Sequence, residues 1–350
     1  MNDSYENRLN IDFRDIHKLS VPIDSSKNYI SASGVYGIDK SLKEYCGFDN
    51  DYKIKAFIEH GINFSEYFEC GFRVHESLPS IMMSPFRENL IKNQKNNHGA
   101  YSIGPFIHYA NPLLKNNDYK EKKEELGTNL LVFPAHSTLG GTTNFSITDF
   151  CDKIQDMGSE FDTVTISLYW KDVELGRDKF YKKYGFEVMT AGYMYDPYFL
   201  NRLRSIIELS DLTISNEIGT SSFYALVLGK PHIILPMNVK YNIEKTDGKY
   251  LSLVAEESYD STVKSAKVND IELIKNSLLK SEGKITNQNK EIINKYSGIY
   301  CVKSKEDLRK ILLECEDNYS SFSYYMRKPL FLKDYAKRMI RISKSQLIDR

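Results

Sequence analysis

The sequence has no excess charge of either sign and no long apolar run. Lys plus Arg and Asp plus Glu number 47 each, so the formal net charge is zero. A balanced chain has no overall field that attracts nucleic acid, so an anionic ligand must bind at a local site. No apolar run reaches the roughly 18 residues of a membrane-spanning helix. The first ten residues are polar and mixed in charge. The sequence therefore predicts neither a transmembrane helix nor a signal peptide, and we expect a cytoplasmic protein.

Cysteine pairs and acidic metal motifs are also missing. The chain has only five cysteines, without a Cys-x-x-Cys pair: Cys46, Cys70, Cys151, Cys301 and Cys315. An odd number of scattered cysteines favours free thiols in a reducing compartment over zinc or disulfides. No Asp-x-Asp motif follows a strand of the C-terminal half, and Asp49-Asn50-Asp51 lies in a poorly patterned region. We therefore expect no metal ion and no cofactor.

The length of 350 residues indicates two domains of ordinary size, each able to bury its own core. Residues 1–50 show little pattern, but strand-like runs follow at 54–58, 80–84 and 100–107, with a helix beginning at Pro85. Residues 111–125 are polar and lysine-rich, and they are the best linker candidate, with a solvated helix as the alternative. We place one domain at 1–120 and the second at 121–324.

From Gly127 onward, strand-like and helical patterns alternate. The strand-like segments are 129–133, 163–169, 186–190, 212–214 and 233–235, and the helical ones are 147–157, 178–184, 197–209 and 223–228. Such alternation is typical of βαβ units, and it predicts an α/β fold with a parallel sheet. Polar or small residues follow four of these strands. Because such strand ends lie on one edge of the sheet, we expect them to form one binding cleft.

The segment 211–235 is the most informative part of the chain. An apolar run ends in Ser215, Gly219 then breaks the chain, and Thr220-Ser221-Ser222 opens a new helix. Hydroxyl residues at this point can cap the helix, and the free amides of a helix start attract phosphate. The same residues would also cap a helix that binds nothing.

These residues resemble the donor-binding half of GT-B glycosyltransferases and of nucleotide-sugar 2-epimerases. The resemblance rests on Glu217, Gly219, the three hydroxyl residues and the Gly229-Lys230-Pro231 ending. It implies two Rossmann-like domains facing a cleft, with the C-terminal helix at 325–350 returning to the N-terminal domain. It also implies a ribose bound by Glu217 and phosphates bound by the Gly/Ser/Thr turn. The expected donor-binding residues are Ser137, Thr138, Gly192, Glu217, Gly219, Thr220, Ser221 and Ser222.

Two further motifs resemble those of bacterial sialyltransferases and polysialyltransferases. Glu59-His60-Gly61 follows a strand-like run and is similar to their acidic-acidic-Gly motif, which supplies the catalytic base. Because His60 replaces one acidic residue, the base is either Glu59 or His60. His136 follows the first strand of the C-terminal half, where it can stabilise the leaving phosphate or serve only a structural role. Together with Ser221-Ser222, this similarity indicates a CMP-linked sugar such as sialic acid or Kdo.

We therefore expect an inverting, metal-independent glycosyltransferase of bacterial surface polysaccharide synthesis, such as capsule or lipopolysaccharide, with a glycan or lipid-linked glycan as acceptor. One alternative is a nucleotide-sugar 2-epimerase, and another is a non-catalytic component of a polysaccharide assembly complex. The basic tail at 332–347 has an apolar face. We expect this face to pack on the protein, with peripheral contact to an anionic membrane as the alternative.

Overall fold

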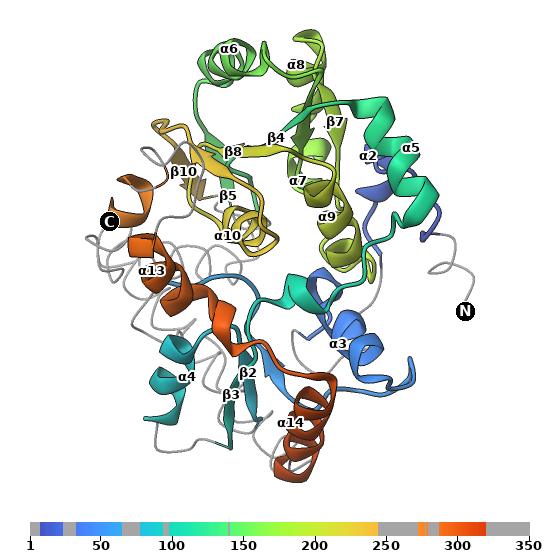
Figure 1. The fold of residues 1–350 in the computed structure, drawn as a ribbon, viewed down its shortest axis with the longest axis vertical. Helices are drawn as coiled ribbons and strands as arrows, with labels where there is room; N and C mark the ends of the chain where they lie inside the picture. The colour runs from blue at the N-terminus through green and yellow to red at the C-terminus, as the bar shows by residue number, and fades with distance from the viewer. Residues whose placement is uncertain are drawn as a thin grey trace, which may run out of the picture.

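The computed structural model describes residues 8–23, 33–64, 78–93, 98–138, 141–243, 272–276, 278 and 287–319. These residues form an α/β fold in which a five-stranded and a three-stranded parallel sheet lie in two halves (Figure 1). The α/β class with parallel sheets flanked by helices, expected from the alternating pattern, is confirmed. The predicted tail helix at 325–350 lies outside the described residues.

The larger sheet has the strand order β7-β6-β4-β8-β9. Its strands are β4 (Asn129–Phe133), β6 (Thr163–Ser167), β7 (Glu187–Met189), β8 (Leu212–Ser215) and β9 (His232–Ile234). Every residue of β4 is buried, which explains its continuous apolar run and its central place in the sheet. The chain runs outward from β4 to β7 and then returns to β8 on the other side. The neighbours β4 and β8 therefore form the switch point at which parallel sheets bind ligands.

Four helices cover this sheet where the sequence pattern predicts them: α6 (Ile147–Gly158), α8 (Asp178–Lys183), α9 (Phe199–Glu208) and α10 (Thr220–Val227). A further short helix, α7 (Trp170–Glu174), was not predicted and occupies a segment expected to be a strand-end loop. The side chain of Ser146 caps α6 by accepting a hydrogen bond from the amide of Asp149 at 3.2 Å. A small antiparallel pair, β5 (Gly141–Asn144) with β10 (Lys240–Ile243), was not predicted. Its two strands lie about 100 residues apart in the chain, so no local pattern indicates their pairing.

The smaller sheet consists of β1 (Phe57–Ile58), β2 (Ser80–Met82) and β3 (Ala100–Ser102). α4 (Pro85–Lys92) begins at the predicted proline and is capped by Ser84. The other elements of this half are η1 (Val35–Gly37), α3 (Ile38–Cys46), η3 (Phe106–Tyr109), α13 (Asn287–Ser297), η4 (Ile299–Cys301) and α14 (Lys305–Asn318).

Two segments pack on the half to which the expected boundaries do not assign them. Near the N-terminus, α2 (Ile16–Leu19) contacts α7, and Ile16 belongs to the apolar cluster behind the larger sheet. Near the other end of the described chain, α14 contacts α3 and α13 contacts α4, both of them helices of the smaller half (Figure 1). Segments near both ends of the described chain therefore pack across the expected boundary at residue 120.

The linker predicted at 111–125 is mainly a helix, α5 (Asn116–Leu126), of which only Leu126 is buried. Its lack of apolar periodicity made it resemble a linker. Hydrogen bonds attach this helix to the rest of the protein: the ammonium group of Lys123 donates to the carbonyl oxygens of Gly127 at 2.9 Å and Leu209 at 3.2 Å. The alternative of a solvated helix is the one that the structure contains.

The largest apolar core is shared between the halves. It includes Ile58 and Ile81 of the smaller sheet, Leu131 of the larger sheet, and Leu203 and Ile206 of α9. α9 joins the halves by packing against η1, α3 and η3, while a second apolar cluster lies within the larger half. In the described ranges, no helix is both long and apolar enough to cross a membrane.

Candidate functional site

A cavity of about 470 Å³ opens at the switch point of the larger sheet. The segments after β4 and β8, the first turn of α10 and one side of α9 line it, together with Tyr36 and Tyr241. The carboxamide oxygen of Asn216 accepts a hydrogen bond from the amide of Ala135 at 2.6 Å, which ties the two strand ends together. A volume of this size is typical of small-molecule sites.

The first turn of α10 forms one wall of the cavity. No hydrogen bond is made by the amides of Thr220, Ser221 or Ser222 to any other described residue. The N-cap residue of the helix is Gly219, which has no side chain to cap it. A Cβ atom on Gly219 would meet nothing within 4 Å. The helix start thus presents unpaired amides to open space, which is the arrangement that binds phosphate.

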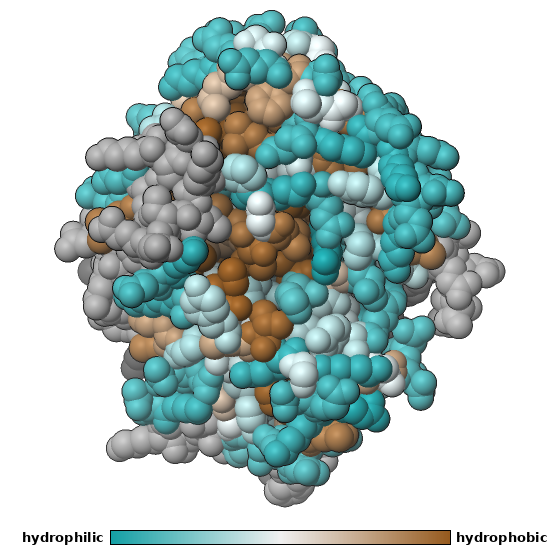
Figure 2. Space-filling model, in the orientation of Figure 1, coloured by the Kyte–Doolittle hydropathy of each residue, from teal (hydrophilic) through white to brown (hydrophobic). Residues whose placement is uncertain are grey.

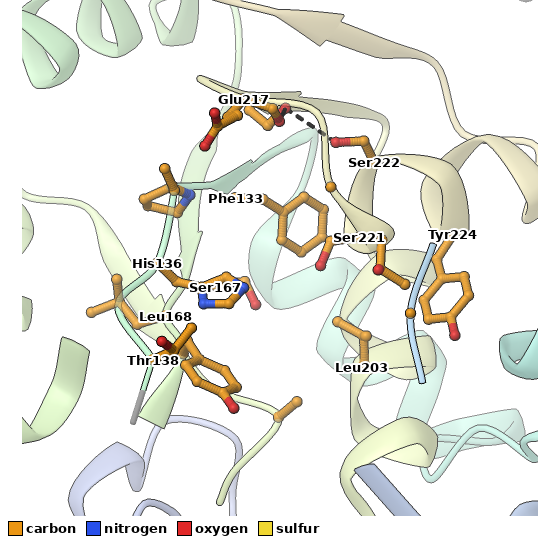
Figure 3. Close-up of a pocket in the computed structure, with 18 of the residues that line it drawn as sticks. Phe133, His136, Thr138, Ser167, Leu168, Leu203, Glu217, Ser221, Ser222 and Tyr224 are labelled. Carbon is orange, nitrogen blue, oxygen red and sulfur yellow. Dashed lines mark hydrogen bonds between the residues drawn. The ribbon is translucent and has the colours of Figure 1, made fainter. Parts of the chain in front are cut away.

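His136, Thr138 and Glu217 lie across the cavity from Ser221 and Ser222 (Figure 3). The ring of His136 packs on Tyr169, with the ring centroids 4.4 Å apart. Near His136, the buried carboxylate of Asp172 accepts hydrogen bonds from the amide of Ser137 and pairs with Arg177 at 2.9 Å. Burial raises the pKa of Asp172, while the neighbouring His136 and Arg177 act in the opposite direction.

Glu217 is the acidic residue of the site. Its carboxylate accepts a hydrogen bond from the hydroxyl of Tyr241, a residue of β10. Burial raises its pKa, and the bond from Tyr241 and the nearby Lys275 and His136 oppose that effect. A carboxylate in this position can accept hydrogen bonds from the hydroxyl groups of a sugar ring.

The other part of the cavity is apolar and aromatic, and the sequence pattern did not indicate it. Tyr36, Phe133, Tyr169, Phe199 and Leu203 all line it. In Figure 2, apolar surface gathers at the centre of the face on which Figure 1 draws α10. Many tyrosines and phenylalanines occur along the chain, so single aromatic residues in the sequence carried little information.

Tyr36 has an unusual backbone. Its φ angle is 60°, a left-handed conformation that costs a tyrosine about 1–3 kcal/mol. The amide of Tyr36 donates to the carbonyl oxygen of Met194 at 2.6 Å, and a Cβ atom on Gly37 would lie 2.3 Å from the carbonyl oxygen of Pro197. The close approach of two backbones therefore holds Tyr36 in the cavity. The glycines at 34 and 37 were the one sequence feature that could have indicated it.

The two candidate bases differ in their surroundings. Neither Glu59 nor His60 is among the residues that line the cavity, and the carboxylate of Glu59 is bound by the guanidinium group of Arg87 at 2.6 Å and 3.0 Å. His60 is exposed to solvent, and its ring contacts the cavity residue Tyr36 with centroids 5.8 Å apart. Desolvation of the ring by the surrounding protein lowers the pKa of His60. A neutral imidazole can accept a proton, whereas a carboxylate bound to arginine is a weaker base.

Two residues expected to bind a donor do not line the cavity. Ser137 is buried, and its hydroxyl accepts a hydrogen bond from the amide of Thr143 at 3.1 Å. The amide of Gly192 donates to the Thr190 hydroxyl at 3.1 Å, and a Cβ there would lie 3.0 Å from Arg202. Both residues shape neighbouring loops, and the cavity contains their neighbours His136 and Ala191 instead. Metal ligation is not apparent: no group of three or more His, Cys, Asp or Glu residues is arranged for it in the part of the chain described.

A buried histidine supports the floor of the site. His232 is fully buried, with Nδ1 2.7 Å from the Thr213 hydroxyl and Nε2 3.0 Å from the Ser215 hydroxyl. The Ser215 oxygen lies 3.2 Å from the hydroxyl oxygen of Ser222 at the start of α10. Burial lowers the pKa of His232 to about 3. The ring is therefore neutral and connects β8 and β9 to the first turn of α10.

This pKa predicts a loss of stability in mild acid. The unfolded chain binds a proton at His232 below its ordinary pKa of about 6.5, whereas the folded protein does not bind one until about pH 3. Stability should therefore fall as the pH drops below about 6.5. Between pH 7 and pH 5, this one group removes about 2 kcal/mol from the free energy of unfolding. Urea unfolding of His232→Gln should show a pH dependence smaller by that amount. An equal pH dependence in both proteins would contradict a neutral, buried His232.

Comparison with known proteins gives only distant matches. No protein-family model matches the chain, and no curated protein matches it in sequence. One similar solved structure is Os79 from O. sativa in complex with UDP, at 10% identity and a TM-score of 0.31, covering 69% of this chain and 51% of Os79. Another is UGT2 of Phytolacca americana complexed with UDP-2fluoro-glucose and pterostilbene, at 11% identity and a TM-score of 0.28, covering 68% of this chain and 53% of UGT2.

The chain thus spans about half the length of these two structures. The similarity is a distant one to plant UDP-glycosyltransferases of the GT-B fold, and it shows no specific family. It assigns neither a substrate nor a reaction to this chain.

Proposed function

We propose that the protein is a glycosyltransferase that moves a sugar from a nucleotide-activated donor to an acceptor. The observation that carries the proposal is the start of α10, where unpaired amides and the hydroxyl of Ser221 face a cavity at the switch point of a parallel sheet. The diphosphate or monophosphate of the donor would bind there. Glu217 would accept hydrogen bonds from the ribose, and His136 would donate one to the leaving phosphate.

The residues around the cavity support a single-displacement transfer. His60 would take the proton from the acceptor hydroxyl as the new glycosidic bond forms at the anomeric carbon. The bond from that carbon to the phosphate breaks in the same step. The negative charge that develops on the phosphate would be stabilised by the α10 amides and by His136. These groups would do what a metal ion does in metal-dependent glycosyltransferases. Such a displacement inverts the configuration at the anomeric carbon.

The apolar part of the cavity favours transfer over the 2-epimerase alternative. An epimerase needs room for only the nucleotide sugar, because both of its chemical steps occur on one bound molecule. Here Tyr36, Tyr169 and Phe199 form an aromatic part of the cavity lining. Aromatic rings of this kind bind the apolar faces of an acceptor.

A thermal-shift panel with CMP, CDP, UDP, GDP and their sugar conjugates tests the donor site. At a concentration 100 times its Kd, a bound nucleotide stabilises the folded state by about 2.7 kcal/mol. Ser221→Asp should abolish this shift, because its carboxylate repels phosphate. The variant should still fold, because an acidic side chain in the first turn stabilises a helix.

Ser304→Asp provides a matched control. Ser304 caps α14, which lies on the smaller sheet away from the cavity, so this variant should keep the full nucleotide shift. If no nucleotide stabilises the wild-type protein, the proposed donor site is wrong, and a non-catalytic role becomes the better explanation.

A further inference from the structure

The loop that carries His60 is attached to the first turn of α10. This loop, residues 59–64, follows β1 of the smaller sheet, whereas α10 belongs to the larger sheet. The amide of Ile62 donates a hydrogen bond to the hydroxyl oxygen of Thr220 at 3.0 Å. Gly61 lies so close that a Cβ atom on it would be 2.9 Å from the same oxygen, and its φ angle of 86° also favours glycine. One hydroxyl group therefore joins the two halves beside the cavity.

A second contact supports the attachment. The ring of Phe64 packs against Phe223 with centroids 5.9 Å apart, and Phe223 is three residues after Thr220, on the same side of α10. Both phenylalanines are buried in one apolar cluster. The loop is thus held to α10 at both ends of 61–64. His60, immediately before this attached segment, points its ring toward Tyr36 in the cleft.

The backbone amide and the hydroxyl group of Thr220 can each form a separate hydrogen bond. Its amide is one of the unpaired amides of the anion site, while its hydroxyl oxygen accepts from Ile62. The hydroxyl proton has no acceptor among the described residues, and it can donate to an oxyanion bound at the helix start. The anion, the Thr220 hydroxyl and the Ile62 amide would then form a continuous chain of hydrogen bonds, in which each bond strengthens the next.

We propose that Thr220 is a positioning residue that couples anion binding at α10 to the placement of His60. The proposal rests on the proposed function for the roles of the anion site and of His60. Its consequence is that the base is aligned with the donor phosphate directly, through Thr220, instead of through the two sheets. Occupation of the anion site should therefore change the surroundings of the His60 ring.

Two variants separate the hydroxyl group from the shape of the side chain. Thr220→Val keeps the size and branching but removes the oxygen, whereas Thr220→Ser keeps the oxygen. In the ligand-free protein, amide hydrogen exchange at Ile62 should be about tenfold faster in Thr220→Val than in the wild type. Thr220→Ser should restore slow exchange. Unchanged exchange at Ile62 in Thr220→Val would overturn the attachment.

Saturating pyrophosphate then tests the coupling, with the His60 Cε1 resonance at constant pH as the readout. Pyrophosphate should move this resonance in the wild type and in Thr220→Ser, but not in Thr220→Val. A helix that was merely less stable would not show this difference. Thr220→Ser also alters the side chain, because it removes the methyl group of threonine, but it keeps the hydroxyl group. An equal movement in Thr220→Val would overturn the coupling alone. Failure of pyrophosphate to bind the wild type would overturn both the anion site and the coupling, even with the exchange result intact.

Discussion

Replacing Asp196 by asparagine is expected to lower the free energy of unfolding by about 3–5 kcal/mol. Asp196 is fully buried between two guanidinium groups, at 2.7 Å from Arg8 and 3.0 Å from Arg202. Burial lowers the pKa of Arg202, and the Asp196 carboxylate counters this effect. Without the carboxylate, two buried positive charges would face each other. Asparagine is nearly isosteric, so the loss would measure the charge and not a cavity.

This ion cluster also shapes the site. Arg202 donates to the carbonyl oxygen of Ala191, a cavity residue, at 2.7 Å, and Arg8 donates to that of Leu19 at 2.6 Å. The cluster therefore attaches the N-terminal segment to the end of β7. Urea unfolding curves give the free energies to be compared. Glu125→Gln is the matched control: it removes a carboxylate from an exposed pair with Arg14 and should cost at most about 1 kcal/mol. A loss as small as this in Asp196→Asn would contradict the role given to the cluster.

The second large effect is expected for His60→Ala. Loss of a general base typically reduces the rate constant of the chemical step by about 10²–10⁴-fold. Nucleotide affinity should change little, because His60 lies on the loop after β1 and not on the α10 turn. Release of the nucleotide from the donor identified by the thermal-shift panel measures kcat, and the thermal shift itself measures binding. A fully active His60→Ala would show that another group takes the proton.

Glu59→Gln distinguishes the two candidate bases. It should keep most of kcat but lose stability, because the ion pair between Glu59 and the buried guanidinium group of Arg87 would be lost. The pH dependence gives an independent check. The pKa of His60 is below its ordinary value of about 6.5, so the base is deprotonated at neutral pH. The wild-type rate should therefore be constant above about pH 6.5 and fall in acid as His60 binds a proton, and this fall should be absent from the residual activity of His60→Ala.

Local pattern predicted elements in both halves of the molecule. The strand at 129–133, the proline-initiated helix at 85 and the hydroxyl-rich start of α10 all occur as expected. Each is determined by neighbouring residues: a continuous apolar run, a proline with a preceding serine cap, or a glycine before hydroxyl residues. The helix α5 did not follow this rule, because distant carbonyl groups and charges stabilise it in place of an apolar face.

The site could be predicted where one segment supplies it, and not where two segments meet. Glu217, Gly219 and Thr220 to Ser222 lie within six consecutive residues, so the sequence by itself determined a hydroxyl-rich helix start at the end of a strand. Only the tertiary structure decided what faces it. Tyr36 enters the cavity because its backbone amide binds the carbonyl oxygen of Met194 from the other half. Likewise, Arg87 of α4 pairs with the carboxylate of Glu59 on the loop after β1. Such contacts join residues far apart in the chain, and their energies depend on the packing of the whole fold.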